Sequence, residues 1–87
     1  MYYFLSFADP DTRQSIGVIV MDTPTVDDAL REAWRLGINP GGPVAFCKIP
    51  VKEVTENNLE LNRFYSREEM IAKGYKTSTE VQRLHEN

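Results

Sequence analysis

Two runs of aromatic and β-branched residues open the chain, at positions 2–8 and 15–22. Each run has the length and the composition of a β-strand. Asp9-Pro10-Asp11 follows the first run and favours a turn, because Asp bonds to nearby backbone amides and Pro fixes its own φ angle. The pattern therefore predicts a hairpin with strands at 2–8 and 15–22.

A helical period follows, in which apolar side chains recur every three or four residues. Thr25 is a suitable N-cap, and Asp27 and Asp28 put negative charge at the positive end of the helix dipole. Gly37 stands where a helix C-terminus favours a left-handed residue. These features predict a helix over about 25–36.

The middle of the chain alternates turn signals with short apolar runs. Residues 37–43 are rich in Gly and Pro and predict a turn, which we call the 37–43 loop. Residues 44–49 predict a third strand, ended by Pro50. Residues 51–65 form a less regular stretch, here called the arm, with a short strand expected near 59–64.

Ser66 and Glu69 have the spacing of a capping box, which predicts a short helix that ends at Gly74. The polar residues after it predict a C-terminal tail or a frayed helix over 75–87. We therefore expect one domain, over residues 1–74, followed by that tail.

The order of elements predicts an α+β fold, with a small antiparallel or mixed sheet, one packed helix, an irregular arm and a short C-terminal helix. Both faces of the hairpin are apolar, since Tyr2 and Phe4 alternate with Tyr3 and Leu5. One helix covers only one sheet face. We expect a second subunit to cover the other face, which predicts a homo-oligomer, unless the arm covers it.

Composition narrows the class of partner. The chain of 87 residues has 10 Lys and Arg against 13 Asp and Glu, a net charge of −3. This argues against a surface for DNA or RNA, and no apolar run reaches the roughly 18 residues of a membrane span. The single cysteine, Cys47, excludes an internal disulfide and fits a reducing compartment. We expect a cytoplasmic protein.

No set of residues has the pattern of a catalytic or metal centre. Cys47 lies in a predicted strand and the single histidine, His85, lies near the C-terminus, with no acid placed to orient it. Asp9 and Asp11 are explained by the turn between the first strands. We therefore expect a protein that is not an enzyme and that holds no metal and no cofactor.

The 37–43 loop is the strongest candidate for a ligand site. Gly41 and Gly42 leave two backbone amides unshielded, and such amides can bind a phosphate closely. Asn39 offers both donors and an acceptor for a base or a ribose. The structural alternative is a helix C-cap followed by a tight turn into the next strand.

A phosphate ligand would also need positive charge and an aromatic surface for its base. Arg35 precedes the loop and Arg63 lies in the arm, and we expect these arginines to supply the charge. Trp34 lies on the apolar stripe of the predicted helix, where a place in the core is sufficient to explain it. Its position beside the loop also permits stacking on the base, as would a tyrosine of the first strand. The predicted ligand-binding residues are Asn39, Gly41, Gly42, Arg35, Arg63, Trp34 and Tyr3.

The motif Gly-Ile-Asn-Pro-Gly-Gly over 37–42, the opening Tyr-Tyr-Phe-Leu-Ser-Phe-Ala-Asp-Pro and the run Arg-Phe-Tyr-Ser-Arg-Glu-Glu over 63–69 support one resemblance. The chain resembles a family of small, largely uncharacterised phage and bacterial proteins, over most of residues 2–69. This chain has Pro43 where that family usually has an acidic residue. By analogy, small acidic phage proteins often inhibit host defence, either by protein contact or as sponges for cyclic nucleotide signals.

With this analogy, we expect a non-enzymatic binding protein, a phage anti-defence sponge that sequesters a cyclic oligonucleotide at a subunit interface. The alternative is a protein-interaction module that inhibits a host protein by direct contact. A small hydrolase or cyclase-like enzyme is a third hypothesis, which the missing catalytic set disfavours.

Overall fold

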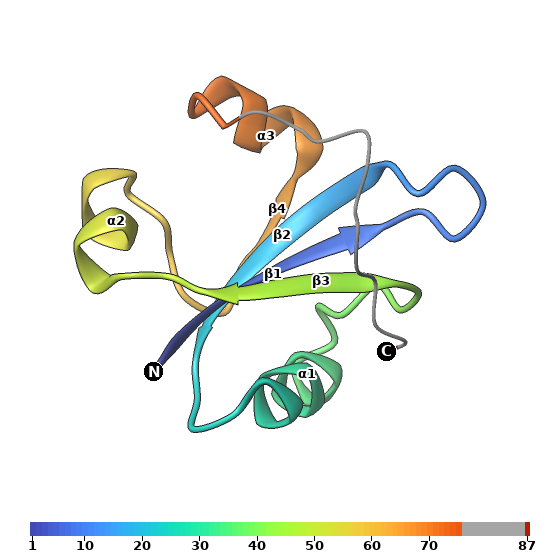
Figure 1. Cartoon of the computed structure of the whole chain (residues 1–87), viewed down its shortest axis with the longest axis horizontal. Coiled ribbons are helices and arrows are strands. Elements are labelled where there is room, and N and C mark those ends of the chain that lie inside the picture. The colour runs from blue at the N-terminus through green and yellow to red at the C-terminus, as the bar shows by residue number, and fades with distance from the viewer. Residues whose placement is uncertain (76–86) are drawn as a thin grey trace.

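A computed structural model describes residues 1–75 and 87 of the chain. These residues form an α+β fold with a four-stranded antiparallel sheet of order β3-β1-β2-β4, which confirms the predicted fold class (Figure 1). Residues 76–86, most of the predicted tail, lie outside this description. The elements are β1 (Tyr2–Ala8), β2 (Ser15–Asp22), α1 (Val26–Arg35), β3 (Val44–Lys48), α2 (Val51–Glu56), β4 (Phe64–Ser66) and α3 (Arg67–Ala72).

The hairpin of β1 and β2 forms the centre of the sheet, at the predicted positions. β3 pairs with the free edge of β1, and β4 pairs with the free edge of β2. The fourth strand is later than the predicted 59–64, because Asn58 and Asn62 have positive φ angles that interrupt an extended backbone. Within 59–63, only Leu61 makes an isolated bridge, to Val20.

Capping residues begin α1 and α3 at the predicted positions. The Thr25 side chain accepts a hydrogen bond from the Asp28 amide at the start of α1, and Gly37 takes a φ of +74° after its end. Ser66 and Glu69 form both bonds of the capping box that begins α3. No helix among the described residues is long and apolar enough to cross a membrane.

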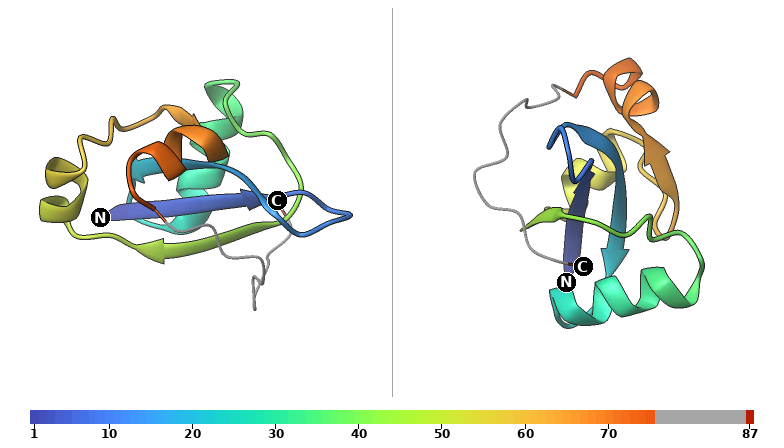
Figure 2. Two further views of the ribbon diagram at one scale, coloured as in Figure 1. Left: turned by 90° about the horizontal axis from the view of Figure 1, so that it is seen from above. Right: turned by 90° about the vertical axis from the view of Figure 1, so that its right-hand side faces the viewer.

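One sheet face packs against α1, which lies across it in Figure 2. Ala29 and Ala33 are the fully buried residues of the helix, and their small side chains let the helix lie close to the strands. This first core consists of Tyr3, Leu5, Phe7, Ile19, Met21, Ala29, Ala33 and Val44.

The other sheet face packs against residues that follow β3, on the side of α3 (Figures 1 and 2). Val54 of α2, Leu59 of the arm and Met70 of α3 are all buried there. The same chain therefore covers the β2 side of the face for which we expected a second subunit. Toward β3, a pocket of about 280 Å³ is lined by Phe4, Ser6, Ala45, Phe46 and Cys47, and the homo-oligomer stays a prediction. This second core consists of Val18, Val20, Ile49, Val54, Leu59, Tyr65 and Met70.

The arm also contains a helix that the sequence did not predict. α2 is one short helix after Pro50, and Val54 is its only buried residue. Six residues are too few to display a helical period, and a helix of that length gains its stability from tertiary packing.

Candidate functional site

The 37–43 loop joins the end of α1 to β3, and Asn39 fixes its shape. Asn39 is only 8% exposed. Its Oδ1 accepts a hydrogen bond from the Gly41 amide at 2.8 Å, and its Nδ2 donates to the Leu30 carbonyl at 3.3 Å and to Asn87 Oδ1 at 2.8 Å. The side chain that we expected to contact a base or a ribose therefore binds the loop to α1.

Gly41 and Gly42 both adopt positive φ angles, +78° and +75°, which favour glycine. The Gly41 amide is engaged by Asn39, so only the Gly42 amide of this pair makes no hydrogen bond within the described residues. Gly42 lines a cavity of about 250 Å³ together with Pro10, Pro43 and Asn87. One of the two amides predicted to bind a phosphate therefore already donates a hydrogen bond within the protein.

Trp34 lies on α1 beside this loop and is 51% exposed. A Cβ atom added to Gly41 would lie 3.4 Å from its Cη2 atom, so the loop passes close to the indole ring. Helical spacing puts Leu30, half-buried, and Asp27, exposed, on the same flank of α1. We call Asp27, Leu30, Trp34 and Gly41 the Trp34 face.

Tyr3, the other predicted stacking residue, lies elsewhere. It is 8% exposed and belongs to the first core, packed under α1. Burial of its ring removes it from the candidate site. Its position in a central strand, with apolar neighbours on both sides in the sequence, is the signal that favours the core.

Arg35 lies on a different flank of α1, where it binds Glu32 through both Nε and Nη2. The hydrogen bonds from Arg35 lower the pKa of Glu32 and raise the pKa of Arg35 itself. Arg31 pairs likewise with Asp28, at 3.3 Å. All four line a cleft of about 490 Å³, whose other walls are Met21, Asp22, Thr23 and Asn62.

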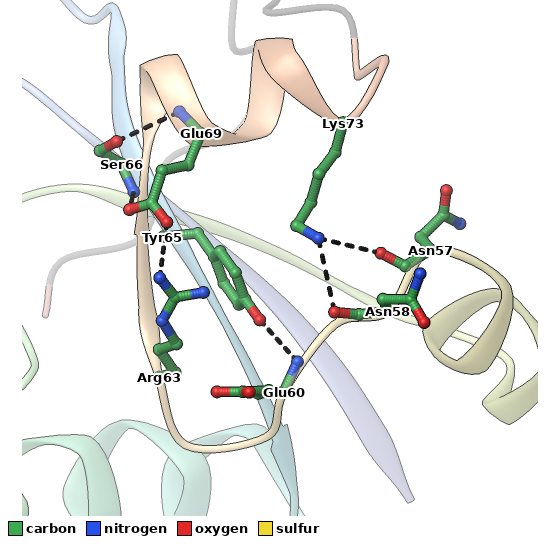
Figure 3. Close-up of polar contacts among 8 residues, drawn as sticks. All are labelled: Asn57, Asn58, Glu60, Arg63, Tyr65, Ser66, Glu69 and Lys73. Atoms are coloured by element: carbon green, nitrogen blue, oxygen red, sulfur yellow. Dashed lines mark hydrogen bonds and ion pairs between the residues drawn. The ribbon is translucent and has the colours of Figure 1, made fainter.

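Arg63 is part of a polar cluster between the arm and α3 (Figure 3). Its guanidinium lies 4.2 Å from the centre of the Tyr65 ring and 2.6 Å from Glu69 Oε2. Neither partner belongs to the 37–43 loop, so the structure does not bring Arg63 together with Asn39 and Gly41.

The same cluster holds the arm in place. The Tyr65 hydroxyl accepts a hydrogen bond of 2.7 Å from the Glu60 amide, and its ring is 1% exposed. Lys73 lies 5.5 Å from the ring centre and donates to the carbonyls of Asn57 and Asn58, after α2 (Figure 3). We call Glu60, Arg63, Tyr65, Glu69 and Lys73 the Tyr65 cluster, and its contacts are structural.

Acid should weaken this cluster. The backbone amide of Ser66, and then Arg63, lower the pKa of Glu69 below its ordinary 4.5. A lowered carboxyl pKa stabilises the folded state above the ordinary value, and that stability is lost as the pH falls through the folded-state pKa. We expect the free energy of unfolding, measured by urea denaturation, to decrease as the pH falls below 4.5.

The Glu69→Gln variant should have lower stability at neutral pH and a weaker loss in acid than the unmodified chain. Glu68→Gln, on the exposed side of the same helix, is the matched control and should follow the unmodified chain. If Glu69→Gln and the unmodified chain lose stability equally in acid, Glu69 is not the group whose protonation causes the loss.

Cys47 and Asp9, the other reactive side chains considered above, lie in surroundings that do not favour catalysis. Cys47 is exposed on β3, and partial burial of the thiol and the charge of Glu53 raise its pKa, which disfavours the thiolate. His85 lies outside the described residues, so its distance from Cys47 is not defined. Asp9 Oδ1 accepts bonds from the Asp11 and Thr12 amides, which lower the pKa of Asp9 and shape the turn.

Within residues 1–75 and 87, no three side chains of His, Cys, Asp or Glu come together as a metal site. The feature that stands out for binding is therefore the Trp34 face. The sequence favoured a core position for Trp34, and this prediction is wrong, because the ring is 51% exposed. The alternative, a binding role beside the loop, stays a prediction. No protein-family model, curated protein or solved structure matches the chain.

Proposed function

We propose that this chain is a non-enzymatic binding protein that docks on a partner protein through the Trp34 face. The single observation that carries the proposal is the 51% exposure of Trp34 at the edge of a fixed loop. Tryptophan is among the residues that most often dominate the energy of a protein–protein interface, because its large ring loses much water-exposed surface on binding.

The surroundings of Trp34 favour a protein over a small molecule. Small ligands bind mostly in concave cavities. Among the residues that the structure describes, Trp34 does not line the cavities found on the surface. An exposed ring outside a cavity can insert into a pocket of a partner, which is how many interface tryptophans act.

The Trp34 face is also held in one conformation before binding. Asn39 ties the loop to the Leu30 carbonyl and to the Gly41 amide, and Gly41 lies against the indole. A surface that is already ordered loses less conformational entropy on association. This favours a specific contact over a nonspecific apolar one.

The resemblance to phage and bacterial proteins gives an expectation for the partner. On that resemblance we expect a protein of the bacterial host, bound in the cytoplasm and inhibited by direct contact. The chain needs no catalytic residue for this role, because occupation of a partner surface is sufficient.

The Trp34→Ala variant should lose partner binding while it keeps its fold. Immobilised chain would be exposed to host lysate, and captured proteins would be quantified by mass spectrometry. A hot-spot residue contributes at least about 2 kcal/mol, so we expect a loss of roughly thirtyfold in affinity.

Ile71→Ala is the matched control, because Ile71 is also 50% exposed but lies on α3. It should capture the same protein as the unmodified chain. The proposal is wrong if Trp34→Ala retains every protein that Ile71→Ala retains.

A cyclic oligonucleotide remains a second candidate ligand, and one observation favours it. The unbonded Gly42 amide borders the cavity of about 250 Å³ next to the loop, and the exposed face of Trp34 is free to stack on a base. Trp34 is the only tryptophan, so its fluorescence reports this site alone. Titration with cyclic dinucleotides and trinucleotides should change the emission if this candidate is right, and leave it constant if the partner is a protein only.

A further inference from the structure

The charges on one flank of α1 are arranged so that they complement a second copy of the same helix. Along the chain they are Asp28, Arg31, Glu32 and Arg35, with signs minus, plus, minus, plus. Helical spacing puts these four residues in one stripe, here called the α1 stripe. The arrangement is antisymmetric about the point between Arg31 and Glu32.

We propose that two copies of the chain associate through their α1 stripes, antiparallel and related by a two-fold axis. Such an axis passes between Arg31 and Glu32 and makes the contact reciprocal. Arg31 of each chain then faces Glu32 of the other, and Asp28 faces Arg35. Every charge meets its opposite, whereas a parallel or shifted arrangement brings like charges together.

The stripe is accessible for this contact. The side chains of Arg31 and Arg35 are 76% and 68% exposed, and those of Asp28 and Glu32 are 44% and 36% exposed. The ion pairs within the helix leave donors unused, because each guanidinium has five N–H groups. The cleft of about 490 Å³ beside the stripe gives room for the partner's side chains.

This association differs from the homo-oligomer that the sequence predicted. That prediction placed the contact on the second sheet face, whose β2 side the chain covers with its own second core. By the same helical spacing, Arg31 lies three residues from Trp34 and four from Asp27, so one end of the α1 stripe borders the Trp34 face. Self-association of the purified chain needs no partner protein, so the dimer is tested separately from the proposed function.

Exposed ion pairs are individually weak and are screened by salt. We expect a weak dimer, visible by sedimentation velocity at high protein concentration and low ionic strength. Its apparent mass should be twice the chain mass of 10.0 kDa, and it should return to the monomer mass at about 500 mM salt.

Charge reversal gives the decisive comparison. Arg31→Glu places two acids opposite each other on both sides of the two-fold axis, and Glu32→Lys places two cations there. Each variant alone should sediment as a monomer. An equimolar mixture should form the dimer again, because each altered residue of one variant meets an opposite charge on the other. Circular dichroism of each variant verifies that the helix is intact.

Restoration by mixing is an outcome that damage to the fold cannot produce. A monomeric unmodified chain at low salt would overturn the proposal. So would Arg31→Glu or Glu32→Lys variants that dimerise as the unmodified chain does, or a mixture of folded variants that stays monomeric.

Discussion

Replacement of Tyr65 by alanine is expected to lower the free energy of unfolding by about 3–5 kcal/mol, the usual cost of emptying a buried aromatic site. Tyr65 is 1% exposed at the centre of the second core. Its removal leaves a cavity and also ends its contacts with Arg63 and Lys73. Because small domains have a total stability of about 5–15 kcal/mol, this variant should be close to unfolding. Urea denaturation of the full chain measures the effect.

Tyr65→Phe separates the hydroxyl from the ring. It retains the packing but removes the bond from the Glu60 amide, which should cost about 0.5–1.5 kcal/mol. A cost below about 1 kcal/mol for Tyr65→Ala would mean that the second core does not depend on this residue.

Gly17→Ala is expected to have the next largest effect on stability, about 1–3 kcal/mol, the usual cost of overpacking. Gly17 lies in β2 opposite Ser66 of β4. A Cβ atom there would lie 2.1 Å from Phe64 Cζ and 2.6 Å from the Tyr65 carbonyl oxygen. The Phe64 ring can move, but the carbonyl belongs to the backbone of β4, so the pairing of β2 with β4 must shift.

A double-mutant cycle with Phe64→Leu tests the cause. The smaller side chain should recover the part of the loss that comes from the ring and leave the part that comes from the backbone. Ser15→Ala, at the start of the same strand, is the control and should change stability by less than about 0.5 kcal/mol. Strict additivity in the cycle would show that the ring of Phe64 does not meet the new methyl group.

The sequence predicted those parts of the fold that local chemistry determines. The hairpin has long apolar runs on both sides of a turn, α1 has a cap and a period, and α3 begins with a capping box. α2 and β4 are short, and tertiary packing decides their conformation. The covering of the second sheet face was left open for the same reason, because Val54, Leu59 and Met70 reach it only once the arm has folded back.

In the candidate site, too, the sequence predicted contacts between chain neighbours and missed contacts that depend on the folded structure. Trp34 and the 37–43 loop are neighbours in the chain, and the structure keeps them in contact. Asn39 is buried because its side-chain amide bonds to the Leu30 carbonyl and the Gly41 amide, and an isolated turn would not make the bond to Leu30. The residue type alone does not reveal this burial. Arg63 pairs with Glu69, six residues further along the chain, because β4 and the start of α3 lie between them. A separation of six residues fits neither the helical nor the strand period, so the sequence pattern did not predict this pair.

The central claim, that the Trp34 face contacts a partner protein, is tested most directly by photo-crosslinking in bacterial cells. A photoreactive benzophenone amino acid would replace Trp34 in one sample and Ile71, on α3, in the other. We expect illumination to join one host protein to the chain from position 34 and not from position 71. No adduct from position 34, or the same adducts from both positions, would contradict the claim.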